Sequence, residues 1–373
     1  MMLHKFSLVT LLFSFCFANA KETHIFSGVS YEEPYQILAL GSALADYSVS
    51  ISDQQLQEMG FQKGGWMAIS EKDWNAFYEK AKVSSSLTLG GSALNVIKGL
   101  AHLGAKCACL GKIGSDGAAE TFLQKLSELH VRSLLRKSPL STGKVLCFIT
   151  PDGQRTMRTF LGASQTLNDI TFDHADFARI KIFHAEGYQL AEADLLYKAF
   201  ALAKQAGAKI SMDLGSAPLV KQYRKELEKI LKEYVDIVFA NEDEAAAFTG
   251  LEPMHACSYL AKLCETAVVT MGKNGGWVKK GKEHYYFPAI PVTVKDTTGA
   301  GDLFASGFLL GVLKERPLKE CAWMGAYLAS HIVCVVGTEL PETAWQELRD
   351  RIKLEESLAK KADLSQGKET AKL

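Results

Sequence analysis

The 373-residue sequence has no net charge, because 42 lysine and arginine residues balance 42 aspartate and glutamate residues. Without an excess of either sign, the protein has no overall field that would recruit nucleic acid or an anionic membrane. The sequence also lacks a Pro-, Gly- or Ser-rich linker, an internal repeat and a low-complexity segment. These absences favour an ordinary soluble globular protein with one large α/β domain or two small ones.

Two common nucleotide-binding motifs are missing as well. A dinucleotide-binding oxidoreductase needs GxGxxG after its first strand, but residues 41–46 read GSALAD. A P-loop kinase needs GxxxxGK followed by Ser or Thr, and no such string occurs. Eight cysteines are present without a CxxC pair, and most stand in apolar runs such as residues 106–110. This pattern favours buried free thiols over disulfides or a metal site.

What the sequence does contain is an alternation of strands and helices. Strands are predicted over residues 36–41, 106–113, 181–185, 209–213, 236–240 and 267–271, and helices over residues 71–82, 92–103 and 118–129. Strands that are apolar throughout, with helices between them, indicate a mainly parallel sheet covered on both faces, with ligands at the carboxyl ends of its strands. Residues 47–70 look like short strands, and residues 142–162 are predicted to form a hairpin around Pro151-Asp152-Gly153.

The two ends of the chain differ from the rest. Residues 1–20 have the parts of a secretory signal peptide: a short basic lead, an apolar run over residues 6–18 and the small-x-small end Ala18-Asn19-Ala20. The apolar run is too short for a membrane-spanning helix, which needs about 20 residues. Residues 355–373 are polar and rich in lysine, which predicts a frayed or disordered tail.

The stretch that points to chemistry is residues 296–302 (DTTGAGD), followed by an apolar run over residues 303–313. A glycine turn that opens into a helix presents unpaired backbone N–H groups and the positive end of the helix dipole, so it binds anions. Asp302 would repel a bound phosphate unless the reaction needs a base beside it, which suggests phosphoryl transfer to a hydroxyl. A tight turn with an aspartate favoured by the dipole is the alternative, and it suffices for a single Gly-x-Gly-Asp.

The full string, running into DLFASGFLLG, resembles the C-terminal signature of the ribokinase-like (PfkB) family of carbohydrate and nucleoside kinases. The resemblance implies a three-layer α/β/α kinase domain over residues 36–352, with a mainly parallel central sheet and a small β lid from residues 47–70 and 142–162. It also implies that Asp302 is the catalytic base and that the amides of Gly299, Ala300 and Gly301 hold the transferring phosphate. Residues 154–163, 183–188 and 296–311 look most like bacterial adenosine-kinase-type members.

A second motif opens the helix over residues 92–103. Paired glycines let the backbone approach a ligand closely, and Asn95 lies one turn into the helix. The alternative is a plain helix start capped by Ser92. The family resemblance implies that the acceptor is held by the residues at matching positions, namely Ser42, Asp46, Gly90, Gly91 and Asn95. Ser42 departs from the family, in which Asn is frequent at that position.

Three further motifs match the family's nucleotide side. Asn241 and Glu244, in an Asn-x-x-Glu string, resemble the element that organises Mg²⁺ through water, although Asn241 as the cap of an acidic helix start is the alternative. Arg155 on a lid strand is expected to close over the phosphates, and Arg158 is considered for the same role; exposed hairpin arginines are the alternative.

The remaining nucleotide-binding residues implied by the resemblance are Thr270, Gly272, Lys273, Gly275, Thr298 and His331. A solvated hairpin lysine and a packed histidine are the alternatives at Lys273 and His331.

The sequence therefore predicts an ATP-dependent kinase that phosphorylates a primary hydroxyl of a nucleoside, with adenosine favoured. A sugar kinase of the same family and a non-catalytic secreted nucleoside- or sugar-binding protein stay as alternatives. The expected cofactors are ATP and Mg²⁺, with a monovalent cation as a further candidate. The expected partner is a small-molecule substrate, with no nucleic acid and, after leader removal, no membrane. The leader predicts secretion, whereas ATP use and free cysteines favour the cytoplasm.

Overall fold

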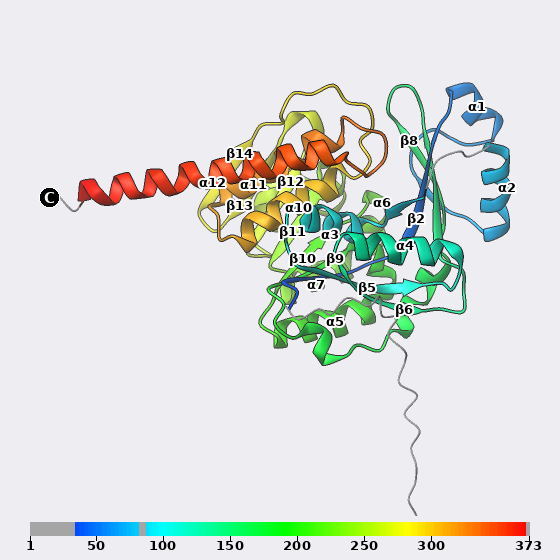
Figure 1. Ribbon diagram of the computed structural model, residues 1–373, viewed down its shortest axis with the longest axis horizontal. Coiled ribbons are helices and arrows are strands. Elements are labelled where there is room, and N and C mark those ends of the chain that lie inside the picture. The colour runs from blue at the N-terminus through cyan, green and yellow to red at the C-terminus, as the bar shows by residue number, and fades with distance from the viewer. Residues whose placement is uncertain (1–33, 82–86, 371–373) are drawn as a thin grey trace, which may run out of the picture.

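The computed structural model describes residues 34–81 and 87–370, so the predicted leader over residues 1–20 lies outside the described residues. Two β-sheets and two layers of helices make up the fold (Figure 1). Within the described ranges, no helix is long and apolar enough to cross a membrane.

The larger sheet has nine strands in the order β14-β13-β12-β11-β10-β9-β1-β5-β6. Its strands are β1 (Ile37–Leu40), β5 (Cys107–Ile113), β6 (Arg132–Lys137), β9 (Ile182–Glu186), β10 (Lys209–Asp213), β11 (Ile237–Asn241), β12 (Thr266–Thr270), β13 (Gly276–Lys280) and β14 (Glu283–Phe287). The pairs from β12 to β6 are parallel, and β13 and β14 add an antiparallel edge. The predicted parallel sheet is confirmed, because every predicted strand is present within about one residue at each end.

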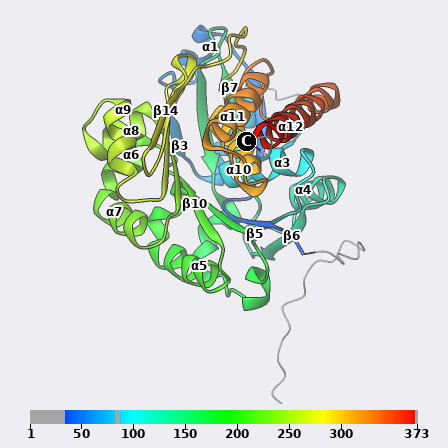
Figure 2. The ribbon, with the colours of Figure 1, turned by 90° about the vertical axis from the view of Figure 1, so that its left-hand side faces the viewer.

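Helices cover both faces of this sheet (Figure 2). One face carries α3 (Ser92–His102), α4 (Gly117–Glu128), α10 (Ala300–Leu313), α11 (Leu318–Ile332) and α12 (Glu342–Thr370). The other carries α5 (Ala193–Gln205), α6 (Ala217–Gln222), α7 (Arg224–Glu233), α8 (Glu242–Thr249) and α9 (Pro253–Leu260). Short 3₁₀ helices complete the chain: η1 (Gly162–Asp169), η2 (His174–Phe177), η3 (Gly187–Glu192) and η4 (Gly272–Asn274).

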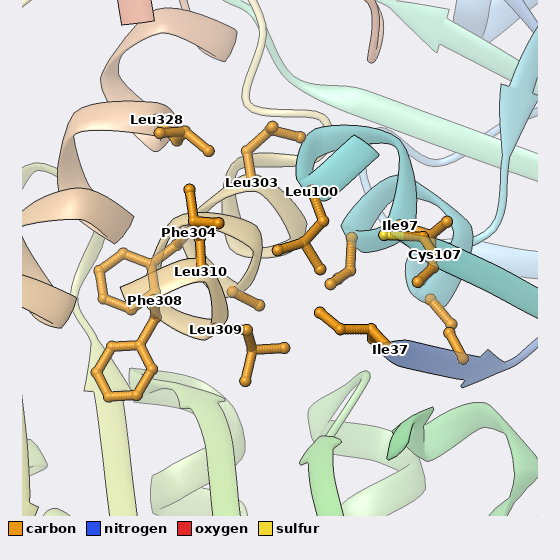
Figure 3. Packing of buried hydrophobic residues seen from close by; sticks show 14 of the residues in the cluster. Ile37, Ile97, Leu100, Cys107, Leu303, Phe304, Phe308, Leu309, Leu310 and Leu328 are labelled. Carbon is orange, nitrogen blue, oxygen red and sulfur yellow. The ribbon is translucent and has the colours of Figure 1, made fainter. Parts of the chain in front are cut away.

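The central helix of the first face is α10. It is apolar on all sides, and residues 303–311 are all buried. Figure 3 shows Leu303 and Leu309 turned toward α3 and β1, and Phe304 and Phe308 on the side away from α3. This burial fixes the N-terminus of α10, and with it Asp302, against the carboxyl ends of the parallel strands.

The smaller sheet is the predicted lid, with strands in the order β3-β8-β7-β2-β4. It consists of β2 (Leu44–Ser50), β3 (Trp66–Ala68), β4 (Thr88–Gly90), β7 (Gly143–Ile149) and β8 (Arg155–Phe160). Helices α1 (Asp53–Glu58) and α2 (Glu71–Ala81) carry apolar residues that pack with lid residues in a separate core.

The prediction of short strands over residues 47–70 holds only in part, and helix α12 reaches into the predicted tail. Residues 47–70 are not strands throughout, because Ser52 and Gln55 form a capping box that starts helix α1. In the tail, α12 continues to Thr370 and extends beyond the body of the molecule (Figure 1), and the fraying expected over residues 355–373 stays a prediction. That tail is rich in Ala, Leu, Glu and Lys, which are strong helix formers.

Candidate active site

A cavity of about 560 Å³ lies between the carboxyl ends of the parallel strands and the lid. Ser42 follows β1, and the next strands contribute Glu186, Asp213, Asn241 and Thr270 at or near their carboxyl ends. The N-terminal turns of α3 and α10 form a further wall of the cavity. Polar groups from strands far apart in the sequence therefore converge where parallel-sheet folds bind their ligands.

Asp302 stands in the first turn of α10 and lines this cavity. Ser92 Oγ donates a hydrogen bond to its Oδ1 at 2.7 Å, and Asn95 Nδ2 donates one to its Oδ2 at 2.8 Å. Burial raises the pKa of Asp302, whereas these two hydrogen bonds and the charge of Arg155 act in the opposite direction. A carboxylate that is fixed in place and made more basic by its surroundings is suited to accept a proton.

The loop before Asp302 forms the wall next to it. Gly299 adopts a left-handed conformation with φ 74° and, among the described residues, no side chain caps the helix that follows. Asp296 is fully buried and fixes the loop, because it accepts hydrogen bonds from the Thr298 amide at 2.9 Å, the Thr298 hydroxyl at 2.6 Å and the Gly337 amide at 2.8 Å. The first amides of α10 have no partner within the helix, although the Ala300 amide donates to the Thr297 carbonyl oxygen at 3.3 Å, so this helix start is suited to bind an anion in the cavity.

Asp46 faces the cavity from lid strand β2. Any side chain at Gly90 would overlap its carboxylate, and any side chain at Gly91 would overlap the carbonyl of Ser42. The two glycines therefore let the start of α3 approach Asp46 and the loop after β1 closely. Burial raises the pKa of Asp46 to about 7, and within the described residues its Oδ1 has no hydrogen-bond partner. An orphaned buried oxygen is a natural acceptor for a substrate hydroxyl.

A comparison with known proteins matches residues 67–345 to the model of the pfkB family carbohydrate kinases. The chain belongs to this family. An adenosine kinase of Saccharomyces cerevisiae is 28% identical over 333 residues, which cover 82% of this chain and 96% of that protein. Two solved structures are 31% identical: an adenosine kinase from Sinorhizobium meliloti, with a TM-score of 0.79, and a probable sugar kinase from Rhizobium etli, with 0.78. They cover 85% and 86% of this chain, and each is covered over 99% of its own length.

Family membership makes this chain a phosphotransferase that acts on hydroxyl groups and uses ATP. Such kinases generally need Mg²⁺, and Asn241 and Glu244 are the residues predicted to hold it through water. The two residues close a capping box, in which Asn241 donates to both carboxylate oxygens of Glu244, at 2.8 and 2.9 Å, and accepts from the Glu244 amide at 2.9 Å. The capping alternative is therefore correct about the local structure.

That capping geometry still fits a magnesium ion held through water. Glu244 lines the cavity, and each of its carboxylate oxygens can accept a further hydrogen bond. Burial raises the pKa of Glu244 to about 7, and the neighbouring charges of Asp243 and Asp302 add to the effect. In the described part of the chain, no group of three or more His, Cys, Asp or Glu side chains could hold a metal directly. Mg²⁺ usually keeps several of its waters, so the outer-sphere arrangement is the one that these residues fit.

The pleat of β8 separates the two arginines proposed for the lid. Arg155 lines the cavity together with Met157. Arg158 does not, because it lies on the opposite face of the strand with its guanidinium 4.2 Å from the centre of the Phe61 ring. The suggested phosphate role for Arg158 was therefore wrong.

By its sequence, the lid offers four apolar side chains as stacking surface for a base, namely Leu146, Phe148, Met157 and Phe160. Of the four side chains proposed, only Met157 lines the cavity. Leu146, Phe148 and Phe160 are buried in the core between the lid and its helices.

Four residues predicted for the nucleotide do not line the cavity. Gly272, Lys273 and Gly275 lie in and beside the η4 turn, beyond the end of β12. His331 lies on α11, where its Nδ1 is 2.9 Å from the Tyr327 carbonyl oxygen and its Nε2 is 3.7 Å from Glu347 on α12. A nucleotide role for these four residues stays a prediction, while Thr270 and Thr298 do reach the cavity.

Sequence reasoning missed several residues of the cavity. Glu186 is buried and accepts hydrogen bonds from the amides of Ser42 at 3.0 Å and Ala93 at 2.7 Å, so it joins the loop after β1 to the start of α3. Glu186 and Asp213 could have been predicted from the sequence, because each is an acidic residue at the end of an apolar strand, β9 and β10 respectively. Trp66 and Tyr188 gave no comparable signal, because only the tertiary structure brings their rings to 6.2 Å.

Proposed function

We propose that this kinase transfers the γ-phosphoryl group of ATP to a primary hydroxyl of a nucleoside, with adenosine as the favoured acceptor and AMP as the product. The observation that carries the proposal is the position of Asp302. It is held by Ser92 and Asn95 beside the amides of an anion site, in the same cavity as Asp46. A base, a phosphate site and a hydroxyl acceptor site thus share one cavity.

The reaction follows from this arrangement. Asp46 accepts a hydrogen bond from the sugar hydroxyls, and Asp302 takes the proton of the primary hydroxyl as its oxygen attacks the γ-phosphorus. The bond to the β–γ bridging oxygen breaks and ADP leaves. Amides at the start of α10 and the guanidinium of Arg155 stabilise the charge on the transferring group. Mg²⁺, held through water by Asn241 and Glu244, would neutralise further phosphate charge.

Support for a nucleoside over a free sugar comes from the lid. Trp66 and Met157 of the lid and Tyr188 below it line the cavity, and the Trp66 and Tyr188 rings lie 6.2 Å apart at an interplanar angle of 47°. Trp66 is 43% exposed, so its ring offers apolar surface that a planar base would cover. A free sugar has no flat apolar face of comparable size. The adenosine kinases of yeast and Sinorhizobium meliloti among the relatives agree with this preference.

A panel of adenosine, inosine, ribose, fructose and 2-keto-3-deoxygluconate, with ADP release as the readout, tests the proposal. We expect the highest kcat/KM with adenosine, and AMP as the product identified by mass spectrometry. A preference for ribose or fructose would instead support the sugar kinase alternative. The similarity to the probable sugar kinase from Rhizobium etli also favours that alternative. Binding of adenosine without any ADP release would support the non-catalytic binding protein.

The predicted leader over residues 1–20 bears on where this reaction takes place, and its cleavage and the compartment stay predictions. Fractionation of cells that produce the tagged full-length protein tests them. Recovery of active kinase from the cytoplasmic fraction, with the N-terminal residues retained, would reject the secretion prediction.

A further inference from the structure

Lys98 is a buried lysine behind the cavity. It lies on α3, one turn after Asn95, and is 5% exposed. Its Nζ donates hydrogen bonds to the carbonyl oxygen of Leu89, to Thr338 Oγ1 at 3.1 Å and, at the limit of the hydrogen-bond distance, to the Thr338 carbonyl oxygen at 3.5 Å. Three oxygen acceptors match the three N–H donors of an ammonium group, whereas a neutral amine offers two. The surroundings therefore fit the charged form.

The two partners of Lys98 belong to opposite sides of the active site. Leu89 stands in lid strand β4 directly before Gly90, whose backbone packs against the Asp46 carboxylate. Thr338 follows Gly337, whose amide donates to Asp296 in the anion-site loop. The methyl group of Thr338 also lies 3.1 Å from the point where a Cβ on Gly299 would stand. One ammonium group thus connects the acceptor strand to the segment that supports the phosphate loop.

The charge of Lys98 also acts on the two cavity carboxylates. It lowers the pKa of Asp46 and of Asp302, in both cases against the larger effect of burial. Burial lowers the pKa of Lys98 itself, while the carboxylates around it oppose that change. The charged or titratable groups that face Lys98 come from five elements or loops, and they are Asp46, His102, Lys125, Asp302 and Glu339.

We propose that Lys98 is a positioning residue, whose buried ammonium group holds the acceptor strand and the phosphate-loop support together. The kinetic part of this inference rests on the proposed kinase function. The structural part does not, because it concerns only the link between residues 88–91 and residues 337–338.

Amide hydrogen exchange of the full chain, without substrate, tests the structural part. Lys98→Met keeps the shape of the side chain but removes its donors and its charge. We expect faster exchange in two separate stretches, residues 88–91 and residues 334–340, since the link between them is lost. Lys125→Met is the matched control. Lys98 and Lys125 line the same small cavity of about 180 Å³, but Lys125 is partly exposed and its ion pair with Glu339 is long, at 4.0 Å. Faster exchange confined to α3, or in neither stretch, would overturn the proposal.

Thr338→Val gives a second route should Lys98→Met fold poorly. It removes only the hydroxyl acceptor of Lys98 and leaves the charge in place. The same two stretches should exchange faster than in the wild type. An unchanged exchange rate in residues 88–91 would contradict the link.

Steady-state kinetics against pH test the catalytic part. Lys98→Met should lower kcat/KM for adenosine by about 10-fold or more, because the two halves of the site lose their alignment. The acid limb of its pH profile should also move to higher pH, since the carboxylates lose a favourable charge; a merely structural role would leave the limb in place. If the wild type is active and the pH profile of Lys98→Met is unchanged, only the catalytic role of Lys98 is contradicted. If the wild type is inactive on every acceptor, the proposed function is contradicted, and hydrogen exchange still tests the structural role of Lys98.

Discussion

At the scale of single residues, the acceptor side depends on a contact between a carboxylate and a backbone. Asp46 approaches Gly90 so closely that no side chain fits at position 90. The same burial raises the pKa of Asp46 to about 7. A substrate hydroxyl would therefore meet an oxygen that is fixed by packing alone, because within the described residues Asp46 Oδ1 has no other partner.

This contact gives a prediction for Gly90→Ala. The added methyl group overlaps the Asp46 carboxylate, so either β4 or Asp46 must shift. We expect the KM for adenosine to rise about 10-fold or more with a smaller effect on the KM for ATP, measured by ADP release. Gly117→Ala is the control, since a Cβ at Gly117 meets open space. An unchanged KM for adenosine in Gly90→Ala would show that Asp46 does not bind the acceptor.

At the scale of elements, strand β8 carries two arginines with different tasks. Arg155 faces the cavity, and Arg158 packs over Phe61 on the other face of the lid. Residues three apart in a strand lie on opposite faces, so only one of them can reach the phosphates.

The prediction for β8 is a separation of function from stability. Arg155→Met should lower kcat by about 10-fold or more and leave the melting temperature within about 2 °C of wild type, because it removes transition-state charge from a partly exposed side chain. Arg158→Met should have nearly wild-type kcat but change the melting temperature, because its stacking on Phe61 is lost. Kinetics and thermal denaturation of both variants provide the measurement. The reverse pattern would contradict the assignment of faces.

At the scale of the whole molecule, the cavity brings several carboxyl groups out of water. Burial raises the pKa values of Asp46 and Glu244 to about 7 and those of Glu186, Asp213 and Asp302 above their usual range. The folded protein thus keeps protons that the unfolded chain has released. The stability contributed by each such group is full below its unfolded pKa and is lost as the pH rises through its folded pKa.

The pH dependence of stability can be tested with Asp46→Asn, which replaces a group that must ionise by a neutral one of similar shape. Relative to wild type, its melting temperature should increase by roughly 2–4 °C between pH 5 and pH 8. Comparing the two proteins at each pH cancels the contributions of groups that do not interact with Asp46, including buried His184, whose lowered pKa of about 4 acts in the opposite sense. Asp169→Asn, at an exposed position, is the control. If the difference in melting temperature between the two proteins is constant across this range, burial does not raise the pKa of Asp46 as described.

The sequence predicted the molecule well where a local pattern decides the structure. Buried strands such as Ile37–Leu40 are apolar throughout, and the DTTGAGD string combines the turn, the helix start and the proposed base within seven residues. Prediction failed where the third dimension decides. Which face of the lid sheet Arg158, Leu146 and Phe148 occupy depends on the register of the lid strands. Helix α1 depends on one capping box. Glu186 accepts a hydrogen bond from Ala93, which is 93 residues away in the sequence, and Lys98 donates one to Thr338, which is 240 residues away. No local pattern reveals either contact.

The central claim is that Asp302 is the base of a phosphoryl transfer to a nucleoside, and Asp302→Asn tests it most directly. Asparagine keeps the shape of the side chain but cannot take the proton. The measurement is kcat for AMP formation from ATP and adenosine, alongside ATP binding by calorimetry, with Asp169→Asn at an exposed position as the control. We predict a loss of about 10²-fold or more in kcat with ATP binding retained. Turnover close to that of the wild type would contradict the account.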